Sequence, residues 1–215
     1  MPRFSDIVVR SSTVAAFIVS AMSAANAGID LTPSPSEYVA EGMKHQQLTF
    51  VQDKQRIEYE PPPSWAFDSS ARLVKLIPPQ KHFAEATIEA IPLTKPQSLD
   101  ENIVKTLEQQ FVAGLPPGSQ FVTLVSAEQN PILLNGNRTL EVTASYQLMG
   151  EKFLKSALFI NLPDTQLIFR FTARKDDFEA LHQIFRTSIL SWQWVENTEP
   201  TSAQTTNAEP SLSTR

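Results

Sequence analysis

The residues that could support catalysis or metal binding in this sequence are few, and their spacing favours structural roles. Three histidines occur, His45, His82 and His182, and two of them follow a carboxylate at helical spacing: His45 follows Glu41 in a short polar stretch, and His182 follows Glu179 in the pattern Glu179-x-x-His182. Carboxylate-rich metal sites in helical proteins use this pattern, but they require a second copy of it and additional carboxylates, which the sequence lacks. We interpret Glu179 and His182 as part of a solvated helix face and predict no metal site.

Nucleophilic and nucleotide-binding motifs are also missing from the sequence. It contains no cysteine, which excludes a thiol nucleophile and a disulfide framework. It has six glycines and neither a G-x-S-x-G nor a G-x-G-x-x-G motif, so a serine hydrolase elbow and a phosphate-binding loop have no support. The acidic pairs Asp100-Glu101 and Asp176-Asp177 lie at predicted helix starts, where the helix dipole favours negative charge. We predict that the protein is not an enzyme and needs no cofactor.

The remaining candidates are aromatic and basic side chains that could contact a protein partner. Trp194 lies beyond the apolar stripe of the last predicted helix, so its ring either anchors a partner or packs against the protein itself. Trp65 follows a predicted strand. Arg170 and Arg174 lie with other basic residues near the last strand and helix, as a local basic patch or as an alternating row of exposed charges. These four residues are the candidate partner contacts.

Composition and the first 27 residues indicate where the protein acts. The 215 residues carry 18 basic and 23 acidic side chains without a basic block, which gives little support for nucleic-acid binding. Arg3 and Arg10 precede the short apolar stretch Val14–Met22, and small residues follow up to Ala27. This order predicts a cleaved signal peptide, with an uncleaved anchor as the minor alternative. No cysteine follows the cleavage point, so we expect a soluble periplasmic, extracellular or lumenal protein that is not a lipoprotein.

The rest of the chain is expected to form one domain. Residues 28–37 resemble a Pro/Ser leader without periodicity, and residues 38–196 contain the alternating and helical patterns of a folded unit. The last segment, 197–215, consists mainly of Ser, Thr, Ala, Glu and Pro, and its composition predicts disorder.

Within this domain the pattern predicts strands, a helix, strands and a second helix. Expected strands are Gln47–Val51, Arg56–Glu60, Ala71–Ile77, Phe83–Leu93, Phe121–Ser126, Leu140–Leu148, Phe153–Asn161 and Gln166–Ala173. The first helix is expected to begin with Ser98 as N-cap in a capping box and to end at Gly114, and the second with Asp176 as N-cap. Asn135-Gly136 and Met149-Gly150 predict tight turns, the first of them a hairpin. Short connections favour an α+β fold with a mainly antiparallel sheet of six to seven strands flanked by helices.

This order of elements resembles the PsbP/DcrB-like superfamily of small exported or lumenal domains, from about Phe50 to Trp192. The resemblance rests on Pro63-Ser64-Trp65, similar to the P-x-W corner of the family, and on Ile189-Leu190-Ser191-Trp192, similar to its I-x-S-F ending. The chain departs from the family in having Trp192 where Phe is usual and three prolines before the corner. The resemblance implies an α/β/α sandwich and an accessory role with membrane or envelope complexes, and identifies no site.

Three functions follow from these observations. The first is a non-catalytic exported module that binds a protein partner in the cell envelope. The alternative is a carrier of a small apolar ligand held between the sheet and a helix. The third, with the least support, is a hydrolase whose catalytic residues come together only in the folded chain.

Overall fold

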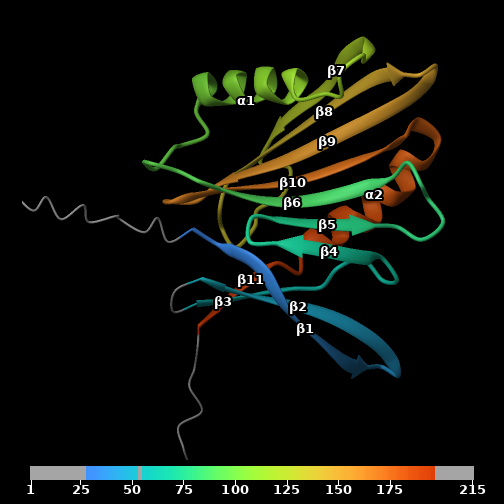
Figure 1. Cartoon of the computed structure of the whole chain (residues 1–215). Coiled ribbons are helices and arrows are strands. Elements are labelled where there is room, and N and C mark those ends of the chain that lie inside the picture. The colour runs from blue at the N-terminus through green and yellow to red at the C-terminus, as the bar shows by residue number, and fades with distance from the viewer. Residues whose placement is uncertain (1–27, 53–54, 197–215) are drawn as a thin grey trace, which may run out of the picture.

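The computed structural model describes residues 28–52 and 55–196, so the predicted signal peptide and tail lie outside the described residues. This part of the chain forms eleven strands and two helices (Figure 1). One group of strands comprises β1 (Asp30–Ala40), β2 (Met43–Gln52), β3 (Gln55–Tyr59) and β11 (Gln193–Glu196). The other comprises β4 (Ala66–Ser70), β5 (Leu73–Ile77), β6 (Glu85–Pro92), β7 (Gln120–Gln129), β8 (Thr139–Leu148), β9 (Glu151–Asn161) and β10 (Thr165–Arg174). The helices are α1 (Glu101–Ala113) and α2 (Lys175–Ile189).

The strands form two sheets, and every pairing within them is antiparallel. The larger sheet has seven strands in the order β4-β5-β6-β10-β9-β8-β7, and the smaller has four in the order β1-β2-β3-β11. The predicted α+β class with a mainly antiparallel sheet is therefore confirmed. The second sheet was not predicted.

The two helices cover opposite faces of the seven-stranded sheet. Successive side chains of a strand point to opposite faces, and β9 shows this directly: Phe159 packs in a cluster with Leu107 of α1, whereas Leu158 belongs to a cluster with Phe178 of α2. The α2 cluster also contains Phe50 of the smaller sheet. The expected sheet flanked by helices is thus present, and the four-stranded sheet adds to the core on the α2 side.

The segment 28–37 is part of this fold, so its prediction as an irregular leader is wrong. β1 begins at Asp30, between the buried side chains of Ile29 and Leu31, and the backbone N–H of Leu31 donates to the carbonyl of Ala71. Prolines in this segment suggested a loop, but β1 is an edge strand whose pairing is irregular between Asp30 and Ser34. Edge positions tolerate proline because no ladder hydrogen bond is lost there.

Both predicted N-caps are wrong by two residues. The carboxylate of Asp100, rather than Ser98, accepts hydrogen bonds from the backbone N–H groups of Asn102 and Ile103 at the start of α1. α2 begins at Lys175 without a side-chain cap, and the acidic residue expected as its N-cap, Asp176, lies in its first turn. A single acceptor at α1 therefore satisfies two of the N–H groups that a helix start leaves unpaired.

Replacing Asp100 with alanine is expected to lower the free energy of unfolding by about 1 kcal/mol, as for other lost N-caps. The matched control is Ser98→Ala, which removes the residue that the sequence favoured and should change stability by less than about 0.5 kcal/mol. Urea denaturation of the two variants and the parent measures both values. A larger loss for the Ser98 variant would contradict the assignment of Asp100 as the cap.

Both predicted tight turns are present, and all four of their residues have positive φ angles. Asn135 and Gly136 have φ angles of 50° and 77°, and Met149 and Gly150 have φ angles of 51° and 83°. The second pair joins β8 to β9, as expected. The first pair does not join two strands of a sheet. It closes the isolated β-bridge between Leu134 and Asn137, which lies in the connection from β7 to β8. The side chain of Asn135 donates from there to the carbonyl of Trp192 at 2.8 Å.

Trp192 joins the two sheets. It follows α2, is 0% exposed, and its ring centroid lies 5.4 Å from that of Phe50 in β2 and 5.3 Å from that of Phe169 in β10. Tyr59 of β3 packs against it at 5.7 Å. One side chain thus contacts strands from both sheets, and the core between them depends on it.

Candidate functional site

Of the two tryptophans considered as partner contacts, neither presents a free ring. Trp65 is 5% exposed and packs against Phe171 and Phe185, so it belongs to the core. Trp194 is half-buried in β11, where its Nε1 lies 3.4 Å from the side-chain oxygen of Gln52. The side chain packs against the core cluster, and its ring centroid lies 6.2 Å from that of Trp192.

The arginines near the last strand and helix do not form one basic patch. Arg170 lies on the α1 face of the sheet and forms an ion pair with Glu89 of β6. Arg186 of α2 pairs with Glu141 on the opposite face at 3.3 Å. The two arginines therefore lie on opposite faces of the seven-stranded sheet, and each pairs with a different carboxylate.

His182 does not lie on a solvated helix face as interpreted from the sequence. Its Nε2 lies 3.2 Å from the Glu141 carboxylate and 3.0 Å from Ser156 Oγ, and its ring stacks on Phe178 at 4.8 Å. Glu179, in contrast, is exposed. Both polar contacts use the same ring nitrogen, whereas a nucleophile-activating histidine uses one nitrogen for the nucleophile and the other for the carboxylate. The geometry therefore fixes α2 on the sheet.

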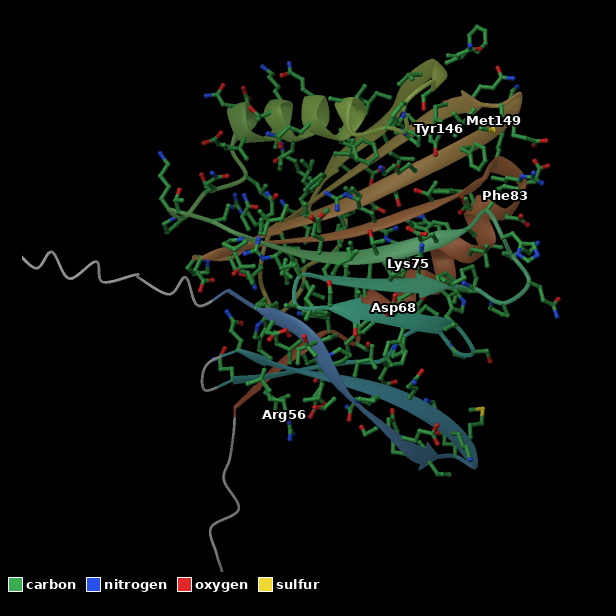
Figure 2. All side chains as sticks on the ribbon, viewed as in Figure 1. Arg56, Asp68, Lys75, Phe83, Tyr146 and Met149 are labelled. Atoms are coloured by element: carbon green, nitrogen blue, oxygen red, sulfur yellow. The ribbon has the colours of Figure 1, made fainter. Side chains whose placement is uncertain are left out.

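Exposed apolar side chains gather at one end of the seven-stranded sheet. We call Phe83, Phe121 and Met149 the apolar rim; they are 56%, 77% and 97% exposed. Phe83 precedes β6, Phe121 begins β7, and Met149 lies in the turn between β8 and β9, so antiparallel order brings them to the same end. Figure 2 shows Phe83 and Met149 there. With strands about 4.8 Å apart, the rim spans about 19 Å from β6 to β7.

Arg174, the fourth candidate contact, lies at this rim. Its guanidinium carbon is 4.1 Å from the centroid of the Phe83 ring, and its Nε is 3.8 Å from the Glu151 carboxylate. A cation held over an aromatic face stabilises the position of both groups. The structure therefore brings one of the four sequence candidates to an exposed apolar surface.

Phe121 has an unusual backbone. Its φ angle is 50°, a left-handed conformation that is rare for a bulky residue, and the pairing of β7 with β8 is irregular between Gln120 and Thr123. This irregularity turns the ring outward beside a groove of about 610 Å³ that Val125, Lys152 and Lys175 also line. Strained backbone of this kind costs about 1–3 kcal/mol and concentrates at functional positions.

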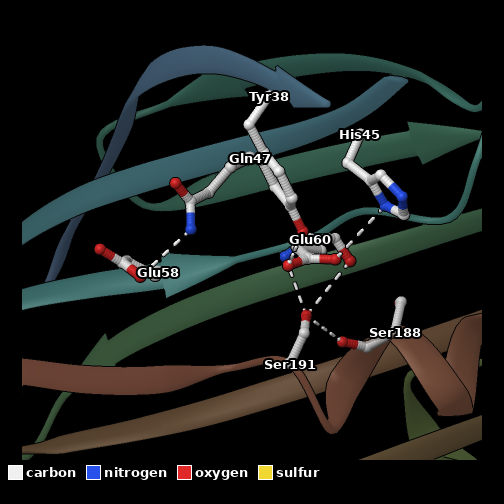
Figure 3. A network of polar contacts seen from close by, with 7 residues as sticks. All are labelled: Tyr38, His45, Gln47, Glu58, Glu60, Ser188 and Ser191. Atoms are coloured by element: carbon white, nitrogen blue, oxygen red, sulfur yellow. Dashed lines mark hydrogen bonds and ion pairs between the residues drawn. The ribbon is translucent and has the colours of Figure 1, made fainter. Parts of the chain in front are cut away.

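A second groove, of about 570 Å³, lies between the four-stranded sheet and α2, and His45, Glu60 and Ser191 are among the residues that line it. Figure 3 shows the polar contacts of these residues. The Tyr38 hydroxyl donates to the Glu60 carboxylate at 2.5 Å, and the ring of His45 stacks on that of Tyr38 at 5.1 Å. The hydrogen bond to Glu60 raises the pKa of Tyr38. Ser191 Oγ accepts from the backbone N–H of Glu60 at 2.8 Å, which ties β3 to the residues after α2.

In residues 28–52 and 55–196, no three His, Cys, Asp or Glu side chains converge in a way that could hold a metal ion. Neither helix in the same ranges combines the length and apolar character needed to cross a membrane.

Comparisons with known proteins give similar structures but no sequence relative. No family model and no curated protein matches the sequence. A protein of unknown function from Pseudomonas aeruginosa is similar in structure, with 14% identity, 73% of this chain and 94% of that chain covered, and a TM-score of 0.41. LpqN of Mycobacterium tuberculosis, involved in cell envelope biogenesis, has 17% identity, coverage of 76% and 89%, and a TM-score of 0.43.

PsbP (CyanoP) of Synechocystis sp. PCC 6803 is also similar in structure. It has 12% identity, coverage of 75% of this chain and 93% of that chain, and a TM-score of 0.48. A PsbP, from the superfamily that the sequence resembles, is therefore among the solved structures to which this chain is similar.

Proposed function

We propose that this protein is a non-catalytic module of the cell envelope that binds a protein partner at the apolar rim and the adjoining edge of β7. The observation that carries the proposal is Phe121, which is 77% exposed although its ring is large and its backbone is strained. Exposed apolar patches of this kind mark interaction surfaces in proteins that otherwise bury such side chains. The signal peptide predicted from the sequence supports the envelope location.

The partner that fits this surface is an extended segment of another protein. β7 is the last strand of its sheet, so the backbone groups along its outer edge are available to a further strand. Glu128 is the single charged residue of β7, so the charges and prolines that usually protect an edge are few. Lys152 and Lys175 line the groove beside it, which favours a segment that combines apolar side chains with carboxylates.

Photocrosslinking in the native cells tests this proposal. A photoreactive amino acid at Val125, which is exposed beside Phe121, should crosslink to one envelope protein. Adding Phe121→Asp should reduce that product about tenfold or more, since loss of a central aromatic anchor costs 2 kcal/mol or more. The matched control is Val39→Asp, a comparable change at an exposed position of β1 in the other sheet, and should leave the product unchanged.

Three results would overturn the proposal. The first is a crosslinked product that Phe121→Asp does not reduce. The second is a product that consists of two copies of this chain, since the rim would then serve self-association. The third is recovery of the protein from the cytoplasm rather than from the envelope.

A further inference from the structure

A cavity of about 340 Å³ lies on the α1 face of the seven-stranded sheet, where the C-terminal end of α1 leaves part of β6, β9 and β10 uncovered. Ile91, Phe111, Phe159 and Ile168 give it apolar walls. Its volume lies within the range of small-molecule sites, which combine such walls with a few convergent polar groups.

Two cations lie together in this cavity. Lys155 of β9 and Arg170 of β10 both line it, and the positive charge of Arg170 acts on Lys155 strongly enough to affect its ionisation. Glu89 of β6, which also lines the cavity, pairs with Arg170, and Glu85 of β6 pairs with Lys75, so neither carboxylate forms an ion pair with Lys155. The ammonium of Lys155 donates instead to the backbone carbonyl of Gly114 at 3.1 Å, a neutral partner.

We propose that this cavity binds a small carboxylate with an apolar body, whose charged group lies against Lys155 and Arg170 and whose chain lies along Phe111 and Phe159. A carboxylate there would compensate the charge that the protein leaves on Lys155, and the aromatic walls would remove the chain from water. This site goes beyond the docking of a protein partner. The alternative function considered from the sequence is a carrier of a small apolar ligand between the sheet and a helix. The cavity gives such a ligand a specific position and requires it to carry a negative charge.

The ionisation of Lys155 agrees with this arrangement. Burial lowers the pKa of Lys155, the positive charge of Arg170 lowers it further, and Glu85 acts in the opposite direction. The charged form of Lys155 is therefore disfavoured without an anion, and an anion that binds beside it raises its pKa again. Because the ammonium form binds the carboxylate, affinity should fall as the pH rises through this lowered pKa.

Isothermal titration calorimetry of the purified protein with octanoate, and with octanol as a neutral probe of the same chain length, tests the site. Octanoate should bind about tenfold or more tightly than octanol, because a hydrogen bond to a charged group contributes about 1.5–3 kcal/mol. Lys155→Met should weaken octanoate binding about tenfold, and Lys155→Arg should retain most of it. Lys105→Met is the matched control, since Lys105 is an exposed residue of α1.

Equal affinity for octanol and octanoate would overturn the proposal. So would unchanged octanoate binding by Lys155→Met, provided that its circular dichroism spectrum and unfolding midpoint match those of the parent. The Phe121 variant used for the partner should bind octanoate normally, so failure of the rim proposal and failure of this one remain distinguishable.

Discussion

Replacing Trp192 with alanine is expected to lower the free energy of unfolding by about 3–5 kcal/mol, a large part of the 5–15 kcal/mol that a domain has. The ring is fully buried and contacts Phe50 and Phe169, which belong to different sheets. Its removal leaves a cavity that neither sheet can close without moving relative to the other. Chemical denaturation followed by far-UV circular dichroism measures the loss.

Trp192→Phe is the informative companion of this variant. In the described residues, the buried Nε1 of Trp192 has no hydrogen-bond partner, so phenylalanine loses contact area but no hydrogen bond. We expect a loss of less than about 1.5 kcal/mol, as for other apolar replacements of similar shape. This position carries Phe in the superfamily that the sequence resembles. Equal losses for the alanine and phenylalanine variants would contradict the role assigned to the ring.

Replacing Glu141 with glutamine is expected to destabilise the protein by about 3 kcal/mol. The carboxylate is buried, forms an ion pair with Arg186 at 3.3 Å and lies 3.2 Å from Nε2 of His182. Breaking a buried ion pair from one side typically costs about 3–5 kcal/mol, because the remaining charge stays buried without a partner. We expect the low end of this range, since the Arg186 side chain is one-third exposed and water can partly solvate it.

The matched control is Glu151→Gln. Glu151 also faces an arginine, Arg174, but at 3.8 Å and at the surface, so its loss should cost less than about 1 kcal/mol. Urea denaturation at neutral pH compares the two variants with the parent. A similar small loss for both would show that water reaches Glu141 in solution and that the cluster does not hold α2 on the sheet.

Local patterns predicted the parts of the fold that depend on neighbouring residues. The alternation from Leu140 to Leu148 predicts β8, and the pair Asn135-Gly136 indicates a tight turn because both residues tolerate positive φ. The pair Met149-Gly150 indicates a turn through its glycine. The caps were less predictable. Ser98 and Asp100 are equally good N-caps by residue type, and only the path of the chain into α1 selects one of them.

Contacts between distant residues were not predictable from one sequence. No local pattern indicates that Ser156 of β9 and His182 of α2 meet at Glu141 of β8. The apolar rim is equally unpredictable from local patterns, because only the strand order brings Phe83 and Met149 to the same end of the sheet. The charge of Arg174 is evident from the sequence, whereas its position over the Phe83 ring depends on the folded chain.

The pairing of β11 with β3 has a consequence for how the protein is made. Chains are synthesised from the N-terminus, and Trp194, which pairs with Ile57, comes almost at the end of the described residues. Until Trp192 is present, the side chains of Phe50 and Tyr59 lack the ring that packs against both of them. The seven-stranded sheet can assemble earlier, since its strands end at Arg174. The four-stranded sheet should therefore be completed after the seven-stranded sheet.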